Sequence, residues 1–176
     1  ADIVCLQESV ESEVGSVQVD SILGKHYEYK DTAMHKGDCV TVFSKYPILS
    51  KERIRYESAG NMSCAFKLRI NHRDVIVINN HLETTGLTFD EKEQFQRMVK
   101  GELGGAAVTR TSKWLIRHLA EQTKKRAPEA DAVARYIAYH RGTPMIVCGD
   151  FNDSPLSYAH RTIAKGLTDC FVTTGN

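Results

Sequence analysis

The sequence lacks an apolar run of about 18 residues, the length that a membrane-spanning helix needs, and it shows no signal-peptide pattern. It also lacks a basic excess, because 23 Lys and Arg oppose 22 Asp and Glu for a formal net charge of +1. Proteins that coat long nucleic acids usually carry a strong basic field. The balance therefore argues against such a role, whereas a small or locally bound phosphate ester stays compatible with it.

Cysteine-based sites are missing as well. The five cysteines form no CxxC pair and no zinc-finger spacing, and their odd number argues against a complete disulfide framework. No HExxH motif is present among the histidines. Cys5 and Cys148 lie inside apolar runs, where we expect them to act as small buried hydrophobic residues.

The sequence does contain three short apolar runs, each of which is followed directly by polar residues. They are Ile3–Leu6, Val75–Ile78 and Met145–Cys148. Continuous apolar runs of this length are typical of strands that are covered on both faces. Further strands are expected at 40–44 and at 64–70, and the second of these alternates apolar and polar residues, which predicts a half-exposed strand joined by a hairpin at Asn71 to the next run.

Helical patterns fill residues 88–140. Acidic residues after Thr88 favour a helix start there, and glycines at 101, 104 and 105 predict a break. The basic run Lys124–Arg126 suits the end of the next helix and a solvated face, and Pro128 then suits the first turn of another helix. A last short helix is expected at 158–165. Together these elements predict an α+β fold, an α/β sandwich with sheets covered by helices, and the hairpin makes the sheet mixed.

The polar residues that end the three buried runs are the candidates for chemistry. They are Glu8, His81, Asp150 and Asn152, and ligands of layered α/β folds gather at the carboxyl ends of strands. Glu8 offers hard oxygens to a cation such as Mg²⁺, and Asp150 can orient or deprotonate a water. His81 and Asn152 can donate hydrogen bonds to charge that develops on phosphate oxygens. The two-residue step from Asp150 to Asn152 puts both side chains on one side of an extended segment.

Each of these residues also has an ordinary structural explanation. A carboxylate after a strand is often a helix cap or a surface group, a lone histidine is often a hydrogen-bonded structural residue, and Asp150 and Asn152 suit a turn. Their joint placement at three strand ends favours a site. The lysine and arginine run at 124–126 is also open to contact with nucleic acid, although a solvated face is the more common role of such a run.

The same segments resemble a known family. Ile3–Glu8, Asn79–Leu82 and Cys148–Asn152, together with the stretch Gly37–Ile48, are similar in type and order to motifs of the endonuclease/exonuclease/phosphatase (deoxyribonuclease I-like) superfamily. The resemblance implies two packed mixed β-sheets flanked by helices. It also implies one catalytic domain over residues 1–176, Mg²⁺ as cofactor with Mn²⁺ as the alternative, and a monomer that acts on a phosphate ester of unspecified class.

Roles for individual residues follow from the resemblance. Glu8 is expected to bind the metal ion, Asp150 to align or activate the attacking water, and Asn152 to bind the phosphate and the transition state. His81 matches a histidine that contacts the scissile phosphate, and Asn79 matches an asparagine expected to contact substrate. The first strand of the family and its late Asp and His motifs have no counterpart here, so the resemblance implies a fold that is incomplete at both ends and a fragment with poor activity of its own.

Two functions therefore stay open at this stage. The first is a divalent-metal-dependent phosphoesterase, of phosphodiesterase or nuclease type, that hydrolyses its substrate by in-line attack of water. The alternative is a non-catalytic binding or scaffold module that keeps the fold. Localisation is not indicated, because the chain opens at Ala1 directly inside a buried-strand pattern and a leading segment is expected to be missing.

Overall fold

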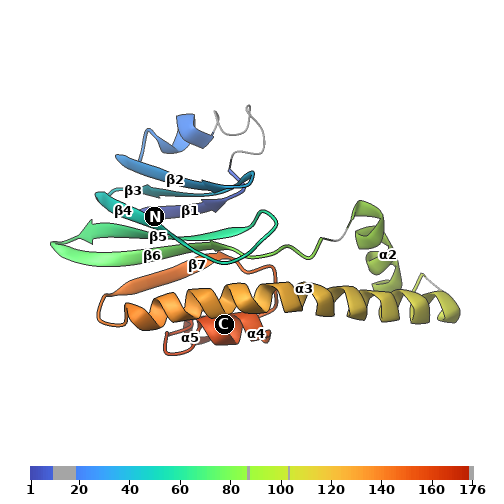
Figure 1. Ribbon diagram of the computed structural model, residues 1–176. Helices are drawn as coiled ribbons and strands as arrows, with labels where there is room; N and C mark the ends of the chain where they lie inside the picture. The colour runs from blue at the N-terminus through green and yellow to red at the C-terminus, as the bar shows by residue number, and fades with distance from the viewer. Residues whose placement is uncertain (10–18, 87, 103, 175–176) are drawn as a thin grey trace.

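The computed structural model describes residues 1–9, 19–86, 88–102 and 104–174. Seven labelled strands and four labelled helices follow one another along these residues (Figure 1). The strands are β1 (Ile3–Gln7), β2 (Tyr29–His35), β3 (Asp38–Ser44), β4 (Ile48–Ile54), β5 (Met62–Ile70), β6 (Arg73–His81) and β7 (Met145–Asp150). The helices are α2 (Phe89–Val99), α3 (Gly105–Tyr139), α4 (Tyr158–Ile163) and α5 (Cys170–Thr174).

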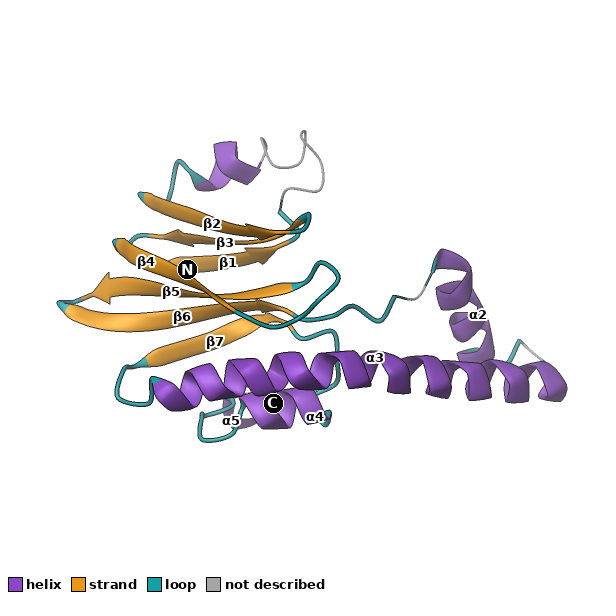
Figure 2. Cartoon of the chain, in the orientation of Figure 1, coloured by secondary structure: helices purple, strands orange, loops and turns teal. Residues whose placement is uncertain are grey.

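The strands form two sheets that lie face to face, with helices against the outer face of the larger one (Figure 2). The smaller sheet has the order β1-β3-β2 and is antiparallel, and the larger has the order β4-β5-β6-β7. Among the described strands only β6 and β7 pair in parallel, so the larger sheet is mixed, as the hairpin between β5 and β6 predicts. The predicted sandwich of two sheets flanked by helices is confirmed.

Two apolar layers hold the sandwich together. Between the sheets, Val40 and Val42 of β3 pack with Phe66 and Leu68 of β5, all fully buried, and Cys5 and Cys148 pack against this layer as free thiols. The other layer lies between the larger sheet and the helices, and its buried members include Ile76, Ile78, Val133 and Ile137. The half-exposed pattern expected for residues 64–70 holds only beyond Phe66, because Ala65 faces the helix layer and is buried as well.

The helices depart from expectation at one place. The predicted break at the glycines is confirmed, and α2 begins with a capping box in which Thr88 and Glu91 bond each other's backbone N–H. However, α3 runs unbroken over 35 residues with Pro128 inside it, so the predicted boundary after Arg126 is wrong. A proline inside a helix costs about 3 kcal/mol. Arg126 and Glu129 anchor the helix to the end of β6 on both sides of Pro128, which offsets that cost.

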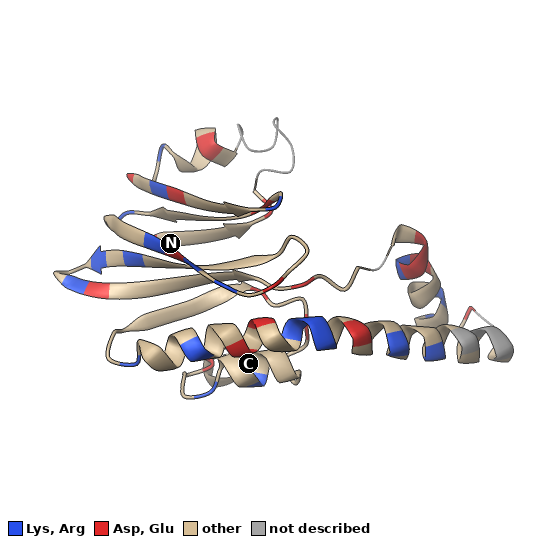
Figure 3. Ribbon diagram, viewed as in Figure 1, with Lys and Arg blue, Asp and Glu red and all other residues tan. Residues whose placement is uncertain are grey.

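Acidic and basic residues are both distributed along the chain. Figure 3 shows both blue and red segments along α3, whereas the strands are mostly tan with a few segments of either colour, which agrees with the nearly neutral net charge. No helix in the described part of the chain combines the length and apolar character required to cross a membrane.

Candidate active site

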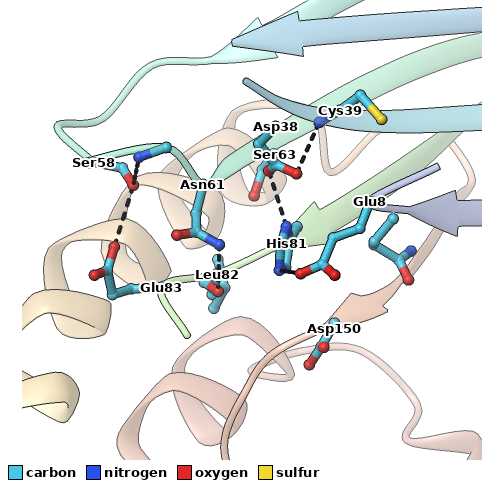
Figure 4. Close-up of polar contacts among 12 residues, drawn as sticks. Glu8, Asp38, Cys39, Ser58, Asn61, Ser63, His81, Leu82, Glu83 and Asp150 are labelled. Carbon is cyan, nitrogen blue, oxygen red and sulfur yellow. Dashed lines mark hydrogen bonds and ion pairs between the residues drawn. The ribbon is translucent and has the colours of Figure 1, made fainter. Parts of the chain in front are cut away.

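His81 is the centre of a polar cluster at the edge where the two sheets meet. It ends β6, its side chain is 5% exposed, and its Nδ1 lies 2.9 Å from Oδ2 of Asp38. Its Nε2 lies 3.1 Å from Oε1 of Glu8, within ion-pair distance but without the alignment of a hydrogen bond. Figure 4 shows the imidazole between the two carboxylates. This arrangement fixes the ring orientation through Nδ1, and it leaves the buried Nε2 without a hydrogen-bond partner among the described residues.

The carboxylates around His81 set its protonation. Burial acts to lower the pKa of the imidazole, but the hydrogen bond and charge of Asp38, followed by the charges of Glu8 and Asp150, outweigh it and raise the pKa above its ordinary value. A protonated imidazole donates from both ring nitrogens. The electrostatic surroundings therefore favour the form of His81 that stabilises an anion at Nε2.

Asp150 stands beside His81 because their strands are paired. In the parallel register of β6 and β7, His81 and Asp150 are partners, and the N–H of Leu82 donates to the carbonyl of Asp150 at 3.0 Å. Asp150 is exposed, whereas His81 is buried. The pair thus presents an exposed carboxylate next to a buried imidazole, and the pairing of β6 with β7 brings these two strand ends together as predicted.

Asn152 turns back toward the same point. Its backbone N–H donates to Oδ1 of Asp150 at 2.8 Å, its φ is +49°, and its Nδ2 donates to the carbonyl of Leu82 at 3.0 Å. The expectation of an extended segment from Asp150 to Asn152 is therefore wrong. The chain bends in an Asx turn, a conformation that Asp and Asn favour because their side chains bond the nearby backbone. The turn still brings Asn152 to the end of β6.

Asn79 lies deeper, two residues before His81. It is fully buried, its Oδ1 accepts from Gln7 at 2.6 Å, and its Nδ2 lies within hydrogen-bond reach of the carbonyls of Leu6 and Thr41. These bonds join β6 to β1 and β3 of the other sheet. The contact with substrate expected for Asn79 stays a prediction, and its described hydrogen bonds give it a part in holding the two sheets in register.

Glu8 has the geometry of a partly open metal ligand. It follows β1 with φ +56°, and its side chain is 49% exposed. Among the described residues no group of three or more His, Cys, Asp or Glu side chains could hold a metal ion. A single carboxylate that faces water suits Mg²⁺, which commonly keeps several waters and takes one or two carboxylates. The donor set fits a hydrated divalent ion and does not fit a closed structural metal site.

Asp38 is the residue of this cluster that the sequence did not reveal. It begins β3, and its side chain is 8% exposed against His81. Because β1 and β3 are antiparallel, with Gln7 opposite Val40, the start of β3 lies beside the end of β1. Attention to the polar residues that end strands overlooks a residue that begins one, although Asp38 stands inside the stretch that resembles the family.

A second polar cluster lies on the other side of Leu82. Arg126 of α3 has a side chain only 2% exposed, which corrects the expectation of a solvated basic run, although Lys125 is 57% exposed. Next to it, Glu129 is 1% exposed and accepts the N–H of Glu83 at 2.8 Å. Burial raises the pKa of the Glu129 carboxyl to about 7, and the charge of Glu83 adds to that rise.

The raised pKa of Glu129 predicts a pH-dependent stability. A carboxyl with a raised folded-state pKa contributes stability below its unfolded value, near pH 4.5, and loses it as the pH rises through about 7. The wild type should lose on the order of 3 kcal/mol of unfolding free energy across this range relative to Glu129→Gln, which keeps the acceptor for Glu83. Urea denaturation at several pH values measures it, with the exposed Glu121→Gln on the same helix as control. Parallel curves for wild type and Glu129→Gln would contradict the assignment.

Comparison with known proteins identifies the family and the fold. The model of the Endonuclease/Exonuclease/phosphatase family matches residues 1–175, so the chain belongs to that family. No curated protein matches the sequence significantly.

Solved structures share the fold at low identity. They include sphingomyelinase C from Streptomyces griseocarneus (TM-score 0.61, 15% identity, 93% of this chain and 56% of that one). Beta toxin from Staphylococcus aureus with bound magnesium ions is similar too (0.61, 17%, 96% and 58%). A humanized D. rerio TDP2 matches as well (0.61, 16%, 99% and 59%). The chain thus spans less than two thirds of these proteins, and the likeness establishes the deoxyribonuclease I-like fold.

Proposed function

We propose that residues 1–176 belong to the catalytic domain of a divalent-metal-dependent phosphoesterase that acts by in-line attack of water. The observation that carries this proposal is the position of His81, held by Asp38 on one ring nitrogen and facing Glu8 with the other, next to Asp150 on the paired strand. A preorganised donor beside an exposed carboxylate suits the hydrolysis of a phosphate ester. Family membership supports the same reaction class.

Each side chain has a distinct part in the proposed reaction. Asp150, exposed at the end of β7, orients the attacking water and accepts its proton. Nε2 of His81 donates to a nonbridging phosphate oxygen, where charge develops in the transition state. Asn152 binds the phosphate from the turn beside Asp150, and Asn79 holds β6 against the opposing sheet so that His81 keeps its place.

The proposed cofactor is Mg²⁺, with Mn²⁺ as the alternative, and Glu8 would hold it. Such an ion supplies Lewis-acid stabilisation of the phosphate oxygens when it is bound. Glu8 also faces Nε2 of His81, so the carboxylate that would hold the ion and the imidazole that would donate to the phosphate belong to one site. The beta toxin structure that shares the fold contains magnesium ions according to its description, which supports the choice.

Removal of divalent ions is the direct test. We expect the full-length protein to hydrolyse phosphodiesters with Mg²⁺ and to lose more than about 95% of its turnover after EDTA treatment, because the transition-state charge then lacks its clamp. Readdition of Mg²⁺ or Mn²⁺ should restore turnover. The assay should offer bis(p-nitrophenyl) phosphate, sphingomyelin, DNA and RNA, so that the substrate class emerges from the same experiment.

A control separates the metal site from general effects of the chelator. Glu8→Gln should raise the Mg²⁺ concentration needed for half-maximal turnover at least tenfold, whereas Glu121→Gln, exposed on α3, should leave it unchanged. Full turnover in EDTA would contradict metal dependence. Absence of turnover on every substrate with either metal would favour the alternative, a non-catalytic module that keeps the fold.

A further inference from the structure

Arg126 is buried in the middle of α3, yet its guanidinium contacts two segments far from the helix in sequence. Its Nη1 donates to the carbonyl of Glu83 at 3.0 Å, and its Nε donates to Oδ2 of Asp153 at 3.1 Å. Its side chain is 2% exposed and that of Asp153 is 15% exposed. A planar guanidinium with donors in fixed directions suits such a double contact, and its charge is matched by the Asp153 carboxylate.

The contact on Glu83 is reinforced from the next turn of the helix. Glu129, three residues after Arg126, accepts the N–H of Glu83 at 2.8 Å. One face of α3 thus satisfies both backbone polar groups of Glu83, the N–H through Glu129 and the carbonyl through Arg126. Figure 4 shows Glu83 and Leu82 continuing the chain from His81. The end of β6 is therefore fixed by side chains where its pairing in the sheet stops.

The two segments that Arg126 joins are those that carry the proposed catalytic groups. Glu83 lies two residues after His81, and Asp153 comes directly after Asn152. Between them, the N–H of Leu82 donates to the carbonyl of Asp150, and Nδ2 of Asn152 donates to the carbonyl of Leu82. Arg126 closes this set of bonds from the helix side, so a displacement of its guanidinium would shift both segments.

We propose that Arg126 is a positioning residue that sets the spacing between His81 and the Asp150–Asn152 turn. It does so by bonding Glu83 and Asp153 at the same time. This inference rests on the proposed function for its catalytic consequence, whereas the bonding itself is independent of any activity. Misplacement of reacting groups by about 1 Å can cost about 10²-fold in rate even when the substitution lies away from the chemistry.

The test compares substitutions that keep size or charge. Arg126→Lys keeps the charge but replaces the planar fork by a point charge, and Asp153→Asn keeps the size but removes the charge of the partner. We expect Arg126→Lys to lower kcat by about 10- to 100-fold with KM within threefold of wild type, and Asp153→Asn to lower kcat about tenfold. Val133→Ala, in the apolar core on the same helix, should lower Tm but keep kcat, which separates positioning from loss of stability.

Hydrogen exchange provides a readout without activity. The amides of Leu82 and Glu83 should exchange at least tenfold faster in Arg126→Lys and in Asp153→Asn than in wild type, whereas the amide of Val77 in the middle of β6 should be unchanged. If Arg126→Lys does not fold, Asp153→Asn alone decides the question by the same measures. Wild-type exchange at these amides in a folded variant would overturn the proposal.

The catalytic consequence of the Arg126 contacts is tested separately from the contacts themselves. Faster exchange with kcat within twofold of wild type would overturn it, and so would an equal fall of kcat in Val133→Ala. If the wild-type protein shows no turnover on any substrate, the proposed function fails. In that case the exchange rates of the two amides still decide whether Arg126 positions these segments.

Discussion

Asp150→Asn should lower turnover by about 10²- to 10⁴-fold, the range typical of the loss of a positioned general acid or base. The amide that replaces the carboxylate can still accept the N–H of Asn152, so the Asx turn is preserved. What is lost is the negative charge that accepts a proton from water. Because Asp150 is exposed and its side chain forms no hydrogen bond or ion pair with His81, the substitution leaves no buried group without a partner. The variant should therefore fold normally and fail in chemistry.

The matched control for this substitution is Asp74→Asn. Asp74 lies near the start of β6, at the opposite end of the strand from His81, and forms a surface ion pair with Arg69. The substitution Asp74→Asn makes the same chemical change in the same sheet. Exposed ion pairs of this kind contribute about 0–1 kcal/mol to the free energy of unfolding. Steady-state rates with Mg²⁺ and urea midpoints should be measured for both. Turnover of Asp150→Asn within fivefold of Asp74→Asn would refute the role assigned to Asp150.

The strand ends that carry the site were predictable because each follows a run of four apolar residues. The expected burial on both faces fits β6 but not the other two strands, since β1 is partly buried throughout and Ile146 of β7 is 49% exposed. The apolar runs before Glu8, His81 and Asp150 become β1, β6 and β7, as expected. In contrast, β2 and β4 were not predicted. Both lie at sheet edges in the described strand order, and their sequences YKDTAMH and ILSKERI mix charged residues with few apolar ones. Edge strands commonly carry charges, which weakens the alternation that marks a strand.

Contacts that depend on tertiary packing also could not be predicted from the sequence. Arg126 lies in a basic run that local sequence explains equally well as a solvated helix end, and only the approach of α3 to the end of β6 buries it. Asp38 reaches His81 because two sheets meet, across 43 residues of sequence. Neither residue has a local signal that separates it from an ordinary charged residue. The family resemblance marked the stretch around Asp38 but assigned it no role.

Gly149 is the residue through which fold and site depend on each other most directly. It lies opposite Asn80 in the parallel pairing of β6 and β7, with φ +134°, a backbone conformation that residues with a side chain rarely adopt. A Cβ at this position would fall 2.5 Å from the backbone N of Asn80 and 2.7 Å from its carbonyl carbon. Both atoms belong to the backbone, so no rotation of a side chain can make room.

Gly149→Ala should therefore destabilise the protein by about 3 kcal/mol or more, from backbone strain and from overpacking between the strands. Because Gly149 and Asn80 directly precede Asp150 and His81, separation of the strands here also moves the two catalytic groups apart. Turnover of the folded fraction should fall at least tenfold, whereas a purely global loss of stability would leave it unchanged. Gly142→Ala, where an added Cβ meets nothing within 4 Å, is the control and should stay within about 0.5 kcal/mol of wild type. Urea midpoints measure the loss of stability, and turnover rates at urea concentrations below the unfolding transition measure the loss of activity. A urea midpoint of Gly149→Ala equal to that of Gly142→Ala would show that the strands tolerate a side chain at this position.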